Sequence, residues 1–380
     1  MKKFLTMILY IATLSAILVG CGAPVGEEDG NNKGSNAEAL KIAIVSSPSG
    51  VDDGSFNQNI YNGILGFVEV NPEATVAAIK EESGAPQAVV QAVADIVADY
   101  NVIVCCGFQF TGITSIAEEN PDVDFILVDS FPSDAEGNKV TVDNIYAMTF
   151  KEQESGFAAG LAAALETKTE KVAVVNGIAY PANVNYQYGF ESGVNYANKH
   201  LGTKAEIIEI SSYAGQDAEG NNIGGNYVGD FDDEATGKML GETLISKGVD
   251  LIFVAAGASG NGVFTAAKET EGVYCIGCDV DQYDDGANGK NNIVLTSALK
   301  IMDKNVRLQL EKVKSGTFQG ENALLGYDTD STGYVSENGR CQLSEETIRE
   351  IGETLEKVKT GHIVPASSNN KLSPENFIGL

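Results

Sequence analysis

The sequence contains no tryptophan and only two histidines, His200 and His362, among its 380 residues. Zinc sites and Ser/His catalytic arrangements depend on histidine, and neither is visible in a chain that has so few. We therefore expect no metal site and no cofactor.

Basic residues are also scarce. The chain has 25 lysines and arginines against 53 aspartates and glutamates, which gives a formal net charge of −28. The negative electrostatic field of a protein with this charge repels phosphate backbones and anionic lipids. The composition therefore argues against nucleic-acid binding and against anionic ligands, and it favours a neutral or cationic ligand.

Cysteine is sparse, with six in the chain. Cys275 and Cys278 have the CxxC spacing of redox and metal sites, but they lie inside the apolar run VYCIGCDV rather than at a helix start. Cys105 and Cys106 lie in a similar run, NVIVCCGF. We interpret all four as small side chains packed in strands.

The first residues have the pattern of a bacterial lipoprotein signal peptide. Lys2 and Lys3 precede the apolar run FLTMILYIATLSAILV, and the run closes with LVGC at Cys21. A transmembrane anchor is the alternative, but the run is short for that role. We predict a signal peptide over residues 1–20, lipidation of Cys21, and a polar, flexible tether over 21–39. The protein is then expected on the extracytoplasmic face of the cell membrane, held by its lipid anchor.

After the tether, strand-like apolar runs alternate with helix-like segments. Examples are KIAIVS, NVIVCC and DFILVDS in the first half, and KVAVVNG, DLIFVAA and NIVLTS in the second. The remaining roughly 340 residues exceed what one core normally organises. The alternation therefore predicts an α/β protein with two doubly wound domains and parallel sheets. Rossmann enzymes share this alternation, so the fold alone leaves the function open.

The stretch GVDDGSFNQ, residues 50–58, directly follows the first predicted strand. It gathers two carboxylates, an aromatic ring and two amides at the carboxyl end of that strand, where open α/β sheets bind their ligands. We expect Ser55 to cap the helix that follows. The alternative is structural: Asp52 and Asp53 would be turn residues, and Phe56 a core residue of the first helical turn.

Other predicted strands also end in polar or glycine-rich loops. Asp129 follows FILV, Asp279 follows VYCIGC, and Lys300 follows NIVLTSAL. The loop GASGNG begins at Gly257, and its glycines would let backbone N–H groups approach a ligand. Its order differs from the dinucleotide fingerprint, and the chain has no GxxxxGK[ST] motif, which disfavours nucleoside triphosphates.

Six segments, taken in order along the mature chain, carry a family resemblance. They are VDDGSFNQ, FKEQESGFAAG, YVGDFDDEATGK, FVAAGASGNGVFTAAKE, GCDVDQ and TSALK. They are similar to successive blocks of the basic membrane protein family of lipoproteins, which includes purine nucleoside receptors of ABC importers. The resemblance implies a fold like that of type I periplasmic binding proteins, with two Rossmann-like lobes and a nucleoside in the cleft.

The resemblance also implies how the chain divides. Lobe 1 is expected over residues 40–150, with a returning segment near 298–325. Lobe 2 is expected over 151–297, with the C-terminal segment 326–380. The protein is expected to be a monomer that delivers its ligand to an ABC permease.

For the base, the resemblance implies roles for residues on the first lobe. Phe56 would stack on the base, and Asp53, Asn57 and Asp129 would bond its edge. Phe231 is the candidate for the opposite aromatic. Three other aromatics of the second lobe compete with it for that role: Tyr180, Tyr227 and Phe190.

For the ribose, the resemblance implies roles for three further residues. Backbone at Gly257 would approach the sugar, and Asp279 and Lys300 would hold its hydroxyls. The alternative for Asp279 and Lys300 is an ordinary surface ion pair.

The sequence thus favours a receptor without enzymatic activity that binds a nucleoside, with purine nucleosides as the expected ligands. A calcium-dependent nucleoside hydrolase is one alternative, but it needs several carboxylates on one ion, and the candidate aspartates are distributed among loops of two lobes. A ligand sensor or adhesin without transport is the other, and the sequence does not separate it from a receptor.

Overall fold

The computed structural model describes residues 39–216 and 220–380. The predicted signal peptide, the lipidated Cys21 and all but the end of the tether lie outside the described residues. Among the described residues, no helix combines the length and the apolar character needed to cross a membrane.

The first sheet has six strands in the order β15-β5-β4-β3-β1-β2, and every neighbouring pair is parallel. Its central strands are apolar on both faces because helices cover both faces, as in other doubly wound sheets. The strands are β1 (Lys41–Ser46), β2 (Thr75–Lys80), β3 (Val102–Cys106), β4 (Asp124–Val128), β5 (Ile145–Phe150) and β15 (Glu321–Leu325).

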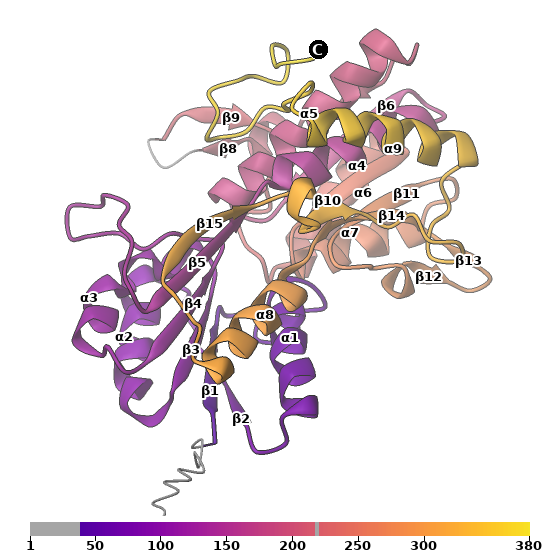
Figure 1. Ribbon diagram of the computed structural model, residues 1–380. Helices are drawn as coiled ribbons and strands as arrows, with labels where there is room; N and C mark the ends of the chain where they lie inside the picture. The colour runs from indigo at the N-terminus through magenta and orange to yellow at the C-terminus, as the bar shows by residue number, and fades with distance from the viewer. Residues whose placement is uncertain (1–38, 217–219) are drawn as a thin grey trace, which may run out of the picture. The chain divides into compact units, whose positions relative to one another are not determined.

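Two helix pairs cover the first sheet (Figure 1). Helices α1 (Phe56–Val70) and α8 (Met302–Ser315) pack side by side on one face, where Ile60, Ile64 and Val306 join one core cluster. Helices α2 (Pro86–Ile96) and α3 (Thr114–Glu119) pack on the other face through a second cluster. Because α8 and β15 belong here, the chain returns to this sheet after it has built the other one.

The second sheet also has six strands, in the order β16-β14-β11-β10-β6-β7. Strand β16 is antiparallel to β14, and the remaining pairs are parallel. The antiparallel edge strand arises because β16 enters from the first sheet and runs back toward the C-terminal segment. The strands are β6 (Lys171–Asn176), β7 (Glu206–Ile207), β10 (Leu251–Ala255), β11 (Tyr274–Asp279), β14 (Val294–Lys300) and β16 (Thr332–Tyr334).

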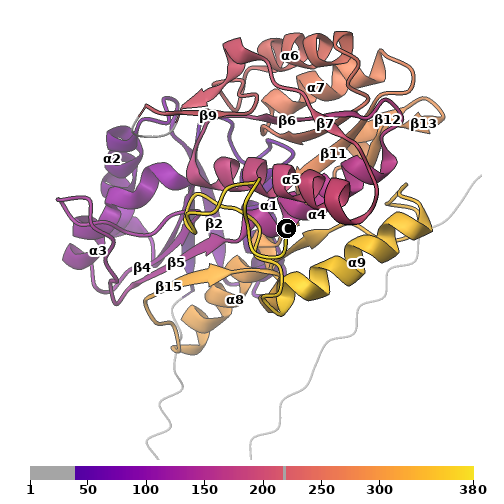
Figure 2. The ribbon, with the colours of Figure 1, turned by 90° about the horizontal axis from the view of Figure 1, so that it is seen from above.

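Helices cover both faces of the second sheet as well (Figure 2). Helices α4 (Glu152–Glu166), α5 (Pro181–His200) and α9 (Glu345–Lys359) share one core cluster. Helices α6 (Glu234–Ser246) and α7 (Ser259–Lys268) share a cluster on the opposite face. The predicted α/β class with two doubly wound sheets is confirmed.

Three crossovers link the two sheets: β5 to α4, β14 to α8, and β15 to β16. They lie side by side, because the Lys151 amide donates to the carbonyl of Leu325 at 2.8 Å and the Ile301 amide donates to that of Ser331 at 2.9 Å. The carboxylate of Glu154 accepts from the amide of Tyr327 at 2.6 Å. The crossovers therefore form one hydrogen-bonded bundle, and the first two deliver Glu152 and Lys300 next to it.

Candidate functional site

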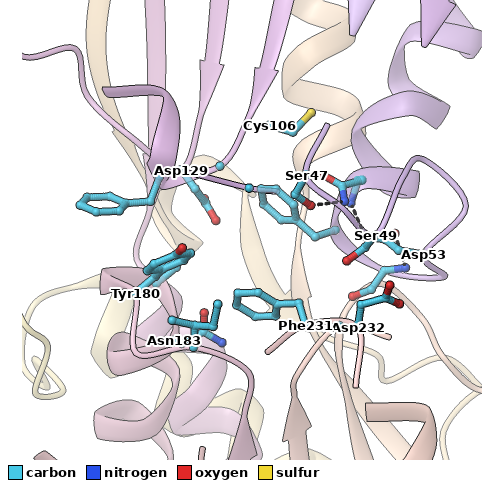
Figure 3. A pocket seen from close by; sticks show the side chains of 18 of the residues that line it. Ser47, Ser49, Asp53, Cys106, Asp129, Tyr180, Asn183, Phe231 and Asp232 are labelled. Carbon is cyan, nitrogen blue, oxygen red and sulfur yellow. Dashed lines mark hydrogen bonds between the residues drawn. The ribbon is translucent and has the colours of Figure 1, made fainter. Parts of the chain in front are cut away.

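A cavity of about 390 Å3 is lined by residues from both sheets. This volume falls within the roughly 300–1,000 Å3 of small-molecule sites. From the first sheet, Asp53, Phe56, Asn57 and Asp129 line it, and Figure 3 shows Asp129 and Asp53 on its walls. From the second sheet, Phe231, Gly257, Asp279 and Lys300 line it. The structure therefore brings all eight sequence-predicted residues to one cavity.

The loop that carries Asp53 is shaped by this carboxylate. Its Oδ1 accepts from the backbone amides of Ser55 and Gln58, both at 3.0 Å, and its Oδ2 accepts from that of Asn57 at 3.0 Å. Burial raises the pKa of Asp53, and the three amides oppose that rise. The carboxylate thus accepts hydrogen bonds from backbone N–H groups at the start of α1 that have no partner within the helix.

Ser55 is the N-cap residue of α1, as predicted, but it does not cap the helix through its side chain. Its side chain makes no capping hydrogen bond, because Asp53 already satisfies the amides of the first turn. The Ser55 hydroxyl instead donates to Oδ2 of Asp279 at 3.4 Å, and this contact links the two sheets across the cavity.

Two buried oxygens on the first-sheet side of the cavity have no hydrogen-bond partner among the described residues. One is Oδ1 of Asn57, whose Nδ2 donates to Ser47 at 3.1 Å. The other is Oδ1 of Asp129, whose Oδ2 contacts Lys300. Buried acceptors without donors are costly. Both side chains line the cavity, and a turn of either would bring its oxygen to the N–H groups of a bound molecule.

Lys300 lies at the centre of the site and is 2% exposed. Its Nζ is 2.5 Å from Oδ2 of Asp129, 3.6 Å from Oε1 of Glu152 and 3.8 Å from Oδ1 of Asp279. Burial acts to lower the pKa of Lys300, but the carboxylates of Asp129, Asp279 and Glu152 outweigh it and raise the pKa. The ammonium is therefore charged, and the alternative of an ordinary surface ion pair is wrong.

Asp129 and Asp279 share an unusual backbone conformation. Their φ angles are 62° and 65°, in the left-handed region that non-glycine residues seldom occupy. Each lies at or just past the end of a strand, and the conformation turns each carboxylate toward Lys300. Oδ1 of Asp279 also accepts from the hydroxyl of Tyr186 at 2.8 Å. Strain of this kind is typical of functional positions.

Aromatic rings line both sides of the cavity. Phe56 lies on the first-sheet side, with its ring centroid 5.0 Å from Nζ of Lys300, and it also packs against the core beside α1. On the other side, the rings of Tyr180 and Phe231 have centroids 6.0 Å apart (Figure 3). Phe108, from the first sheet, contacts Tyr180 at 5.6 Å. These rings provide flat apolar surfaces within one cavity.

The structure distinguishes the aromatic residues that were candidates for stacking on the second face of the base. Tyr180 and Phe231 line the cavity, whereas Tyr227 and Phe190 are buried in the second-sheet core and do not line it. Phe231 lies over Gly177, where a Cβ atom would come within 2.3 Å of its ring. Because Gly177 has no side chain, the Phe231 ring can pack directly against the backbone there.

The charges around the cavity are mostly acidic. Among the described lining residues, Lys300 is the one basic side chain. Glu82, Asp230 and Asp232 add carboxylates to those already described. Negative charge of this density disfavours phosphorylated ligands.

Sequence analysis missed several residues of the site. Phe108 follows the strand NVIVCC, so the strand-end argument could have found it. Glu152 lies two residues past the end of β5, so the same argument could have found it as well, whereas Tyr186 lies within helix α5 and carries no local signal of that kind. Among the described residues, no group of three or more His, Cys, Asp or Glu side chains is arranged to hold a metal ion.

Comparison with known proteins gives a consistent pattern. A family model described as "Bmp: ABC transporter substrate-binding protein PnrA-like" matches residues 40–368. The chain is 28% identical over 383 residues to the ABC transporter nucleoside-binding protein BmpA of Lactococcus lactis, covering 95% of this chain and 97% of that relative. It is 27% identical over 378 residues to the CD4+ T-cell-stimulating antigen of Listeria monocytogenes, covering 95% of this chain and 98% of that relative.

Solved structures match in fold. An ABC transporter solute-binding protein from Aeropyrum pernix has a TM-score of 0.71 at 22% identity, with 87% of this chain and 94% of that chain covered. A second, from Conexibacter woesei, has a TM-score of 0.62 at 20% identity, with 87% and 99% covered. At sequence identities this low, the two matches show similarity of fold alone.

Proposed function

Because the chain belongs to the Bmp family of PnrA-like ABC transporter substrate-binding proteins, we propose that it binds a nucleoside in this cavity and delivers it to a membrane permease. One observation carries the proposal: a single cavity combines aromatic faces with unpartnered buried acceptors and a carboxylate–ammonium cluster. A nucleoside presents a flat base, N–H groups on the base edge, and ribose hydroxyls, which match these features. The Lactococcus relative, named a nucleoside-binding protein, adds support.

The base is assigned to the aromatic part of the cavity. Phe56 and Phe231 stack on its two faces, and Oδ1 of Asn57 and Oδ1 of Asp129 accept from its N–H groups. A purine gives the rings more area than a pyrimidine, and we propose purine nucleosides as the ligands. Asp53 contributes through the loop that it shapes, since its oxygens already accept from three backbone amides.

The ribose is assigned to the second-sheet side. Asp279 accepts from sugar hydroxyls, Lys300 donates to a sugar oxygen, and Gly257 lets the backbone approach the ring. The φ of Gly257 is 55°, which favours glycine at this position. A neutral ligand also suits the acidic lining, whereas a nucleotide phosphate would be repelled.

The structure gives less support to a calcium-dependent hydrolase. Such an enzyme needs carboxylates that converge on one ion. Here Asp129, Glu152 and Asp279 converge on the ammonium of Lys300 instead. We therefore propose a receptor that acts as a monomer without catalysis, anchored by a lipid on Cys21 to the extracytoplasmic face of the membrane. A sensor without transport would use the same cavity, and a permease-dependent uptake assay would separate the two.

A thermal-shift screen tests the ligand class. The purified protein is heated with nucleosides, free bases, sugars or amino acids, each in excess. A ligand present at a hundred times its dissociation constant adds about 2.7 kcal/mol of stability, so the melting temperature rises measurably. Purine nucleosides are expected to give the largest shift, and chromatography of the same samples should recover the nucleoside uncleaved. A shift with sugars or amino acids alone would overturn the proposal.

A further inference from the structure

Glu152 is buried beside the site without lining the cavity. It is the first residue of α4, directly after the β5-to-α4 crossover, and it is 2% exposed. Lys300 does line the cavity, and its Nζ is 3.6 Å from Oε1 of Glu152. Glu152 is therefore connected to the cavity through Lys300 rather than directly.

The other oxygen of Glu152 ties it to the C-terminal part of the chain. Oε2 accepts from Nδ2 of Asn185 at 2.9 Å. Oδ1 of Asn185 accepts in turn from the amide of Ser368 at 2.9 Å and from its hydroxyl at 2.8 Å. This chain of contacts fixes the carboxyl in place and so fixes the position of Lys300.

The three carboxylates around Lys300 are not equally compensated. Asp129 is closest, at 2.5 Å. Asp279 accepts from Tyr186 and Ser55, and its side chain keeps 12% exposure. Glu152 has one amide donor, and its Oε1 lies 3.6 Å from the ammonium. It has neither the close ion pair of Asp129 nor the two hydroxyl donors and the exposure of Asp279, so it is the carboxylate that the site stabilises least.

The charge of this cluster is unbalanced. If all three carboxylates were ionised, the single ammonium would leave a net negative charge in a buried site, which is costly. Burial raises the pKa of Glu152 to about 7, with Lys300 opposing the rise and Asp129 adding to it. Tyr186 on α5 also faces the cluster, and burial raises its pKa, so its hydroxyl stays neutral.

We propose that Glu152 is a positioning residue of the ligand site, which holds the Lys300 ammonium between Asp129 and Asp279 and takes up a proton when a ligand covers the cluster. A bound ligand removes the remaining water from Asp279, and excess negative charge then becomes more costly. A proton from solvent on Glu152 removes one negative charge. The carboxylates of Asp129 and Asp279 remain beside the ammonium and line the cavity, where they can accept from the ligand. This inference rests on the proposed nucleoside site.

Calorimetry with guanosine on the wild type and on Glu152→Gln tests it. Titrations near pH 7 in buffers of different ionisation enthalpy count the protons taken up on binding. The wild type should take up a fraction of a proton, and its affinity should fall several-fold between about pH 6 and pH 8 by linkage. Glu152→Gln should take up none, and its affinity should vary little with pH.

Glu191→Gln is the matched control. Glu191 is also buried, burial raises its pKa to about 8, and it contacts Gln187 rather than any residue lining the cavity. This variant should keep the proton uptake of the wild type. Uptake that persists in Glu152→Gln, or that disappears in Glu191→Gln, would overturn the assignment.

A ligand-free measurement separates this inference from the proposed function. The folded pKa of Glu152, about 7, exceeds its ordinary value of 4.5. The stability that Glu152 contributes at pH values below its unfolded-state pKa is therefore lost as the pH rises through its folded-state pKa. Without ligand, the melting temperature of the wild type should fall more between about pH 5 and pH 8 than that of Glu152→Gln. Parallel curves would overturn the role of Glu152, whereas a wild type that binds no nucleoside would overturn the proposed function.

Discussion

Lys300 and Asp129 belong to different sheets, yet Nζ of Lys300 lies 2.5 Å from Oδ2 of Asp129 inside the cavity. Their contact is a buried ion pair between the ends of β14 and β4. A pair of this kind contributes modestly when complete, but its disruption leaves an uncompensated buried charge. Here the charge left behind would be that of several carboxylates, because Glu152 and Asp279 share the same ammonium.

Lys300→Met is therefore expected to destabilise the protein strongly. Removing one partner of a buried pair typically costs about 3–5 kcal/mol. Chemical denaturation of the ligand-free protein measures the loss. Lys238→Met is the control, because Lys238 forms an exposed pair with Glu269 and its loss should have little effect. Equal stability of the two variants would contradict the buried-cluster interpretation.

Much of the site followed from the sequence for a geometric reason. Parallel strands bring their carboxyl ends to one edge, so residues just after each strand, such as Asp129 and Lys300, gather there. Gly257 begins a glycine-rich loop of this kind, whereas Phe231 was placed by family resemblance, and both line the cavity. The recognised family and the α/β fold were both confirmed.

The rest depended on contacts that no local pattern encodes. Glu152 meets Lys300 only because two crossovers run side by side. Tyr186 reaches Asp279 from the middle of a helix covering the sheet. Ser55 had the right residue type for a cap, but Asp53 has a longer reach to the same amides. The sequence gives no measure of such competition.

Phe56→Ala is expected to weaken nucleoside binding. Loss of a stacking face costs about 1–3 kcal/mol per base. Calorimetry measures the affinity, and the melting temperature without ligand provides the control. Phe56 also touches the core beside α1. If the ligand-free protein lost several kcal/mol of stability while the affinity stayed the same, Phe56 would be a core residue only.

The acidic lining is expected to exclude phosphorylated ligands. Asp230 and Asp232 line the cavity near Phe231. The double variant Asp230→Asn, Asp232→Asn should narrow the affinity gap between guanosine and guanosine 5′-monophosphate, and the effect should shrink at high salt because screening weakens the repulsion. Competition binding at two ionic strengths measures this. If the double variant and the wild type show the same affinity gap at low salt, residues other than Asp230 and Asp232 cause the discrimination.

Cys21→Ser is expected to abolish membrane association without harming the fold. Cys21 follows the apolar leader and lies outside the described residues, which form their own cores. Cell fractionation reports the location, and thermal unfolding of the purified variant reports the fold. A variant that is still processed and membrane-bound would reject the lipid anchor.

Asp279→Ala is expected to lower affinity for ribonucleosides and to blunt any discrimination against deoxy analogues. A carboxylate can accept from two neighbouring hydroxyls at once, and hydrogen bonds to a charged group contribute roughly 1.5–3 kcal/mol. Calorimetry with guanosine, 2′-deoxyguanosine and guanine on wild type and variant measures both effects.

Tyr186→Phe is the control for this last prediction. It removes the hydroxyl that donates to Oδ1 of Asp279 but keeps the carboxylate in the cavity. Discrimination between guanosine and 2′-deoxyguanosine should therefore persist in Tyr186→Phe and shrink in Asp279→Ala. If the wild type binds guanine as tightly as guanosine, or if Asp279→Ala keeps full guanosine affinity, Asp279 does not hold the ribose. Its contact with Ser55 would then make it a residue that only joins the two sheets.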